Sequence, residues 1–84
     1  VTIIPALDYD VAWHPDGDWI ASTSEDGDIF LWDVETGELV TAWQFEGCDI
    51  TVFIWSANGE RFAFKCRQTE PNVRNNLVIG ELIR

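Results

Sequence analysis

The chain has 84 residues, a length that ordinarily makes one small domain. Fifteen acidic residues against five basic ones give a formal net charge of −10. This acidity argues against binding to nucleic acid or to an anionic membrane surface, which need Lys and Arg, and no apolar run approaches the ~18 residues of a membrane span. A basic protein partner is compatible with the charge.

The residues predict a succession of short strands from the first residue onward. Residues 1–4 are all β-branched and are followed by Pro5, which predicts a short strand that stops there. Further strands are expected wherever apolar and β-branched residues lie between turn residues. They cover residues 11–13, 19–24, 28–34, 39–45, 53–55, 61–66 and 77–83.

Turn residues separate these strands. Pro15 and Gly17 suit the corner and the exit of a tight turn, and residues 25–27 (Glu-Asp-Gly) and 35–38 (Glu-Thr-Gly-Glu) predict two more. Residues 67–76 are mostly polar, contain Pro71 and are expected to form a longer loop.

The chain also repeats itself. Residues 53–59 match residues 11–17 at an offset of 42, with Trp55 over Trp13 and Gly59 over Gly17. A period near ~42 residues is typical of the blades of a β-propeller.

Residues 15–33 contain Pro-Asp-Gly, a strand of small residues, Asp-Gly and then Ile-Phe-Leu-Trp-Asp. In this order they resemble a WD repeat. The resemblance implies an all-β fold made of two four-stranded antiparallel blades of a WD-like β-propeller, incomplete as a single chain. It covers one repeat strongly, and the second repeat diverges: Gly80-Glu81 stands where Trp32-Asp33 stood. A related propeller repeat of the Trp-Ser-Pro-Asp-Gly type is the second family that residues 53–59 resemble.

The resemblance also implies where the blades divide. Residues 1–45 comprise an outer strand plus the first blade, and residues 46–84 the second blade without its outer strand. A closed propeller needs roughly four to eight blades. Two assemblies are therefore expected, either a fragment of a larger propeller or a ring of self-assembling two-blade subunits, with three or four copies.

In WD propellers a His, a Ser or Thr, a Trp and an Asp form a hydrogen-bonded set in each blade. Ser22 or Ser24, Trp32 and Asp26 match three of these places, and the Gly-His dipeptide is missing.

The resemblance implies a non-catalytic scaffold for protein–protein interaction, with the binding residues in loops on one face. The expected partner-binding residues are Asp8, Tyr9, Glu25, Asp26, Asp49, Arg67, Gln68, Asn72 and Arg74. The polar loop of residues 67–76 is favoured among them, because an insertion on one face of a repeat array often marks the binding face.

The remaining chemistry-bearing residues predict no catalytic, cofactor or metal site. The acidic turns lack the spacing of a calcium loop, and His14 is expected to be a solvated turn residue. Cys48 and Cys66 have no metal spacing and are expected to be reduced, buried thiols of a cytoplasmic protein. Trp13 and Trp55 are expected in the core.

Two other functions are alternatives to the scaffold. A carbohydrate-binding ring would use Trp19 or Trp43, the tryptophans expected to be more exposed, as stacking platforms. An accessory propeller of a peptidase would require a catalytic domain, of which this chain carries no motif.

Overall fold

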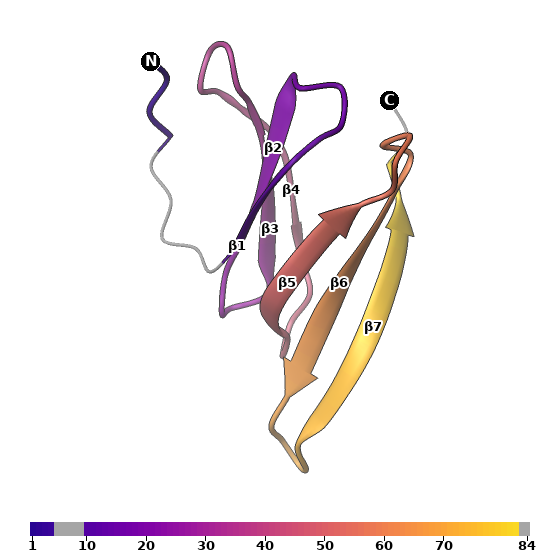
Figure 1. Ribbon diagram of the computed structural model, residues 1–84. Coiled ribbons are helices and arrows are strands. Elements are labelled where there is room, and N and C mark those ends of the chain that lie inside the picture. The colour runs from indigo at the N-terminus through magenta and orange to yellow at the C-terminus, as the bar shows by residue number, and fades with distance from the viewer. Residues whose placement is uncertain (5–9, 83–84) are drawn as a thin grey trace.

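The computed structural model describes residues 1–4 and 10–82. Seven antiparallel strands form two sheets that pack face to face (Figure 1). The first sheet contains β1 (Asp10–Trp13), β2 (Trp19–Thr23), β3 (Asp28–Asp33) and β4 (Leu39–Gln44), in that order. The second sheet contains β5 (Asp49–Trp55), β6 (Arg61–Gln68) and β7 (Arg74–Glu81), also in chain order. The all-β prediction is confirmed.

Two strands differ from the prediction. β5 begins at Asp49, before the predicted start, and β7 begins at Arg74. Because β6 also extends to Gln68, half of the predicted loop belongs to strands. Arg67 pairs with Asn75, and Gln68 pairs with Arg74. The sequence does not indicate this pairing, because an exposed edge strand forms its backbone hydrogen bonds with the neighbouring strand whatever its side chains are, and so needs no apolar alternation.

Residues 1–4 do not form the predicted strand. Val1 and Ile3 are fully or largely exposed. A strand needs a neighbour for its N–H and C=O groups, and no strand of the described chain pairs with these residues.

The hydrophobic core lies between the two sheets and follows from the alternation of each strand. It is made of buried side chains from both inner faces: Ala21, Ile29, Leu31, Cys48, Ile50, Phe53, Phe62, Phe64 and Cys66. Trp19, Trp43 and Trp55 are partly buried against this core. The expectation for Trp55 is confirmed, whereas Trp19 and Trp43 are less exposed than predicted. Trp13, predicted in the core, is 59% exposed because it points away from the second sheet.

Polar contacts also join the sheets, all between β1 or β2 and the second sheet. They are Phe53 N–H to Asp10 Oδ2 (2.8 Å), Trp55 Nε1 to Ala12 O (3.1 Å), Thr23 Oγ1 to Ile50 O (3.2 Å) and His14 Nε2 to Gly59 O (3.0 Å). Because most of these atoms are buried or partly buried, the contacts fix the register of one sheet on the other.

Each sheet has its own internal tie. In the first sheet Trp32 Nε1 donates to Ser22 Oγ at 2.9 Å, as the resemblance implied. In the second sheet a disulfide joins Cys48 to Cys66, so the prediction of reduced thiols is wrong. The sequence could not show that the link before β5 folds back on β6. Among the described residues no helix is long and apolar enough to cross a membrane.

Candidate protein-interaction site

The loops of the two sheets gather at two opposite ends. The lower end in Figure 1 holds the start of β1, the β2–β3 turn, the β4–β5 link and the β6–β7 loop. The upper end holds the β1–β2, β3–β4 and β5–β6 turns. Predicted binding residues can therefore form one surface only if they lie at the same end.

The β2–β3 turn is rigid and presents two carboxylates. Ser24 Oγ accepts the backbone N–H groups of Asp26 and Asp28, at 3.3 and 3.1 Å. Gly27 has a φ of +86°, and its carbonyl accepts the N–H of Phe45 at 2.8 Å. Only glycine fits there, because a Cβ would collide with the Phe45 carbonyl. The turn is thus fixed against the β4–β5 link.

The β4–β5 link is held on its other side by the second sheet. The Cys48–Cys66 disulfide joins it to β6, and Asp49, the first residue of β5, pairs with Arg67. The Asp49 Oδ1 atom is buried and has no hydrogen-bond partner among the described residues. A buried carboxylate oxygen without a donor is rare in folded proteins, so Asp49 has unused capacity to accept a hydrogen bond.

The β6–β7 loop completes the lower end. Arg67 and Arg74 are exposed and lie on neighbouring strands beside the loop, which contains the exposed Asn72. Gln68 lies near Gly47 of the β4–β5 link, since its Nε2 is 3.7 Å from where a Gly47 Cβ would stand.

The structure thus brings most of the predicted residues to one end. Those at the lower end are Glu25, Asp26, Asp49, Arg67, Gln68, Asn72 and Arg74. Asp8 and Tyr9 lie outside the described residues. Their role in binding stays a prediction.

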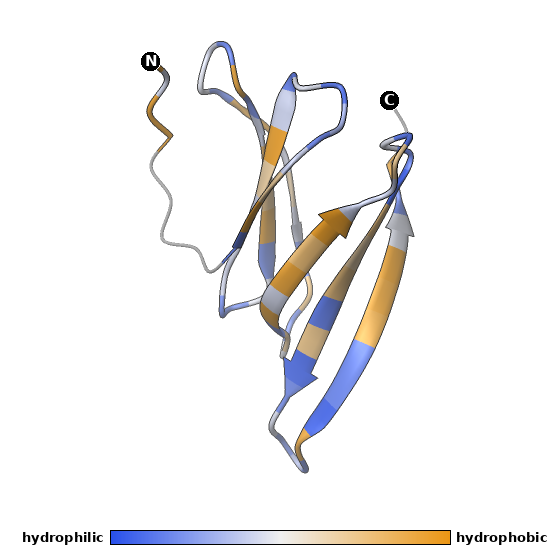
Figure 2. Ribbon diagram, viewed as in Figure 1, coloured by the Kyte–Doolittle hydropathy of each residue, from blue (hydrophilic) through white to orange (hydrophobic). Residues whose placement is uncertain are grey.

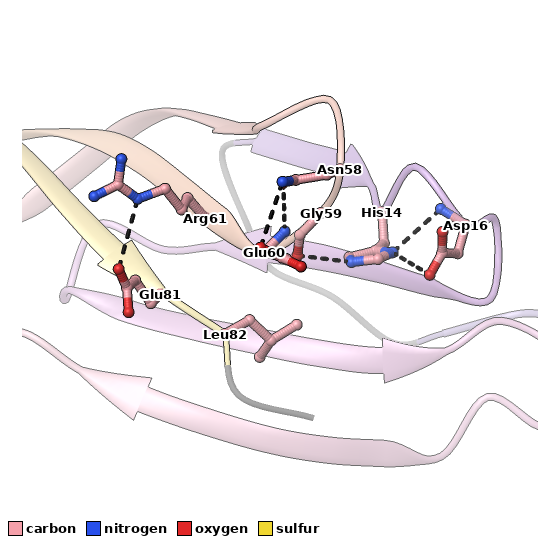
Figure 3. A pocket seen from close by; sticks show the side chains of 8 residues that line it. All are labelled: His14, Asp16, Asn58, Gly59, Glu60, Arg61, Glu81 and Leu82. Atoms are coloured by element: carbon pink, nitrogen blue, oxygen red, sulfur yellow. Dashed lines mark hydrogen bonds and ion pairs between the residues drawn. The ribbon is translucent and has the colours of Figure 1, made fainter.

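His14, at the upper end, has a different role from the one predicted. It is 2% exposed, and its ring packs edge-on against Trp55 at 4.8 Å between ring centroids. With Nε2 donating to Gly59 O, Nδ1 accepts the N–H of Asp16 at 3.2 Å (Figure 3). Sequence reasoning missed this because the partner, Gly59, lies 45 residues away.

The carboxylates of Asp16 and Asp18 lie close to this ring, each with an oxygen 3.8 Å from Nδ1. One ligand atom of each of the three side chains falls within 4.8 Å of the others. The lone pair of Nδ1 already accepts a hydrogen bond from the Asp16 amide. On the other side of the ring, Nε2 bonds to Gly59 O, so His14 links the two repeats of the chain.

Comparison with known proteins identifies the architecture. Residues 9–33 match the family model "WD domain, G-beta repeat". Two solved structures of Hsv2 from Kluyveromyces lactis share the fold, the first with a TM-score of 0.67 and 22% identity over 92% of this chain and 23% of that one. Residues 9–33 are thus a WD repeat, and the chain has the fold of a WD-repeat β-propeller.

Curated relatives of this WD-repeat chain match over short stretches. A "Ribosome biogenesis protein BOP1 homolog" from Arabidopsis thaliana is 53% identical over 30 residues, 36% of this chain and 4% of the relative. The "Pre-rRNA-processing protein IPI3" from Mycosarcoma maydis is 35% identical over 57 residues, 68% of this chain and 10% of the relative. The chain therefore spans a tenth or less of the length of these relatives.

Proposed function

We propose that this WD-repeat chain is a non-catalytic scaffold that binds a protein partner at the lower end of its blades. The observation that supports this is the position of three separate chain segments at this end: the β2–β3 turn, the β4–β5 link and the β6–β7 loop, which projects beyond the other two (Figure 1). The β2–β3 turn and the β4–β5 link are held by backbone bonds and by the disulfide, so this part of the surface is preorganised, which lowers the entropy lost on binding.

The charges of the lower end define the chemistry of the partner. Glu25 and Asp26 lie on the side of the first sheet and suit Lys or Arg side chains. Arg67 and Arg74 lie on the side of the second sheet and suit a carboxylate or backbone carbonyls. The proposed partner is a protein segment that presents basic groups to the first sheet and acceptors to the second.

The relatives support a role in a multi-protein assembly, since the names of two of them refer to ribosome biogenesis and pre-rRNA processing. The cytoplasmic location remains a prediction. It was inferred from reduced cysteines, and the disulfide removes that argument. Disulfides persist in oxidising compartments and are rare in the cytosol, and Cys48 is bonded to Cys66.

The test is a peptide selected for binding to the immobilised chain from a random display library, followed by titration against variants. Arg67→Glu with Arg74→Glu should weaken binding by tenfold or more without changing the melting temperature. Arg61→Glu is the control, because it makes one of these Arg-to-Glu exchanges on an exposed residue at the upper end. Equal binding by all three proteins would rule out the lower end.

A carbohydrate-binding function is the second candidate, and one observation favours it. Trp19 and Trp43 line a common cavity of about 440 Å³ between β4 and the end of β7, together with Glu81 and Leu82. Aromatic faces beside a carboxylate suit a sugar ring with its hydroxyl groups. Tryptophan fluorescence that does not change across a broad sugar panel would eliminate this candidate.

A further inference from the structure

The Cys48–Cys66 disulfide lies at the lower end, yet the pairing of β5 with β6 does not depend on it. Cys66 pairs with Ile50, whereas Cys48 belongs to the β4–β5 link, outside the ladder. A residue two positions before Ile50 in a straight strand would lie about 7 Å from Cys66, but the Cα atoms of the two cysteines are 4.9 Å apart. The link therefore bends toward β6 before β5 begins, and the disulfide holds this bend.

Two backbone hydrogen bonds connect the disulfide to the β2–β3 turn. The N–H of Cys48 donates to Phe45 O at 3.1 Å, and the N–H of Phe45 donates to Gly27 O at 2.8 Å. Gly27 directly follows Glu25 and Asp26, the two carboxylates of the turn. The acidic turn of the first sheet is thus joined to β6 through the link.

The residues that follow the two cysteines also belong to the proposed binding surface. Asp49 follows Cys48, Arg67 follows Cys66, and Asp49 and Arg67 are partners in the β5–β6 ladder. Figure 2 shows hydrophilic residues at the lower ends of β6 and β7. A movement of the link would therefore change the arrangement of binding groups from both sheets.

Other contacts keep the two sheets together without the disulfide. The four polar contacts between the sheets use neither cysteine. The ring of Phe45 also packs against Phe64 of β6, with 4.9 Å between the ring centroids. Opening the disulfide should therefore release residues 46–48 and leave the sheets packed.

The difference in exposure between the two cysteines indicates where a reductant reacts. Cys48 is 7% exposed and Cys66 is 2% exposed, so a thiolate of a dithiol attacks Cys48 Sγ, and Cys66 leaves as a thiolate. The second thiol of the reductant then displaces Cys48 from the mixed disulfide. Two electrons and two protons pass from the dithiol to the two cysteines, and the dithiol becomes a disulfide.

We propose that the Cys48–Cys66 disulfide is a redox switch of the lower-end binding surface. In the oxidised chain the link is fixed and the surface is preorganised. Reduction by a dithiol releases the link, so that ordering it on binding costs entropy and weakens the complex. Disulfides persist in oxidising compartments and are rare in the cytosol, so binding would follow the redox state of the surroundings. The inference rests on the proposed scaffold function, because it assigns a control to that same surface.

Hydrogen–deuterium exchange, resolved by residue with NMR, tests the structural part of this proposal. The oxidised chain is compared with the chain reduced by dithiothreitol, and circular dichroism follows the fold of both. Reduction should speed the exchange of the Phe45 and Cys48 amides tenfold or more. The amides of His14 and Ser56, which are hydrogen-bonded in turns at the upper end, should change far less.

Titration with the peptide selected from the display library, in this case against the oxidised chain, tests the effect on binding. The reduced chain should bind this peptide at least tenfold more weakly, and reoxidation with oxidised glutathione should restore the affinity. The matched control carries Cys48→Ser with Cys66→Ser. It should bind as weakly as the reduced wild-type chain, and dithiothreitol should change neither its affinity nor its exchange rates.

The switch would be overturned by unchanged exchange of the Phe45 and Cys48 amides or by equal affinity of the oxidised and reduced chains for the peptide. Equal acceleration of exchange at both ends, or loss of the circular dichroism of the sheets, would also overturn it, because the disulfide would then support the whole fold.

The Arg67→Glu, Arg74→Glu double variant separates this failure from failure of the proposed function. If it weakens binding while the redox state does not, the scaffold function stands and only its redox control fails. If it binds the peptide as well as the wild-type chain, the lower end is not the binding surface, and the scaffold function fails together with its control.

Discussion

Gly59 and Gly17 occupy equivalent turns of the two repeats, with φ angles of +73° and +79°. Their surroundings differ. A Cβ at Gly59 would collide with the imidazole of His14 and come within 3.1 Å of Pro15 Cγ, whereas a Cβ at Gly17 would meet nothing within 4 Å. Replacing each glycine with alanine thus makes the same backbone change with and without a steric clash.

The two costs can be estimated separately. A left-handed backbone costs an L-residue about 1 kcal/mol, and this is the whole expected effect of Gly17→Ala. Gly59→Ala adds overpacking against the His14 ring, about 2 kcal/mol, and loss of the His14–Gly59 hydrogen bond, about 1 kcal/mol. We therefore expect Gly59→Ala to lower the free energy of unfolding by about 4 kcal/mol, roughly 3 kcal/mol more than Gly17→Ala.

Urea denaturation at 25 °C, followed by circular dichroism at a single protein concentration, measures both values. A double-mutant cycle identifies the cause, since His14→Ala removes the obstructing ring and should make the further change Gly59→Ala cost only about 1 kcal/mol. Equal destabilisation by Gly17→Ala and Gly59→Ala would refute the packing of His14 against the second sheet. So would full additivity in the cycle.

Two further predictions concern the ties of the second sheet. Replacing Cys48 and Cys66 together with Ser should lower the free energy of unfolding by about 3 kcal/mol, because the disulfide closes a loop with a sequence separation of 18. A reductant should have no further effect on this variant. Free thiols in the unreduced wild-type chain would contradict the disulfide. Trp55→Phe keeps an aromatic ring but removes the indole N–H that donates to a carbonyl of β1, and it should lower the free energy of unfolding by about 1 kcal/mol in the same denaturation assay. Trp13→Phe, at the exposed equivalent position, should cost much less.

The sequence by itself determined the class of fold and most of its strands. The alternation of apolar residues, the turn glycines and the repeat at an offset of 42 are local signals, and they suffice for strands joined by tight turns. A bond between Trp32 and either Ser22 or Ser24 was also foreseeable from the repeat motif, and the structure shows that Ser22 is the acceptor. The same local signals placed the predicted binding residues in loops, whereas Asp49, Arg67, Gln68 and Arg74 lie at the ends of strands. Strand order in a repeat fold still fixes the end of the sheet at which each of them lies.

Tertiary structure alone decided the contacts between distant segments. Burial of His14 depends on Gly59, and the disulfide depends on the β4–β5 link folding back on β6. Neither has a local sequence pattern, since each joins residues brought together only when the sheets pack. Trp13 and Trp55 illustrate the same point. They occupy equivalent positions in the two repeats, but the first sheet covers Trp55, whereas no described residue covers Trp13 in the same way. A strand pattern shows that a face is apolar, but what covers that face depends on the packing of the whole assembly.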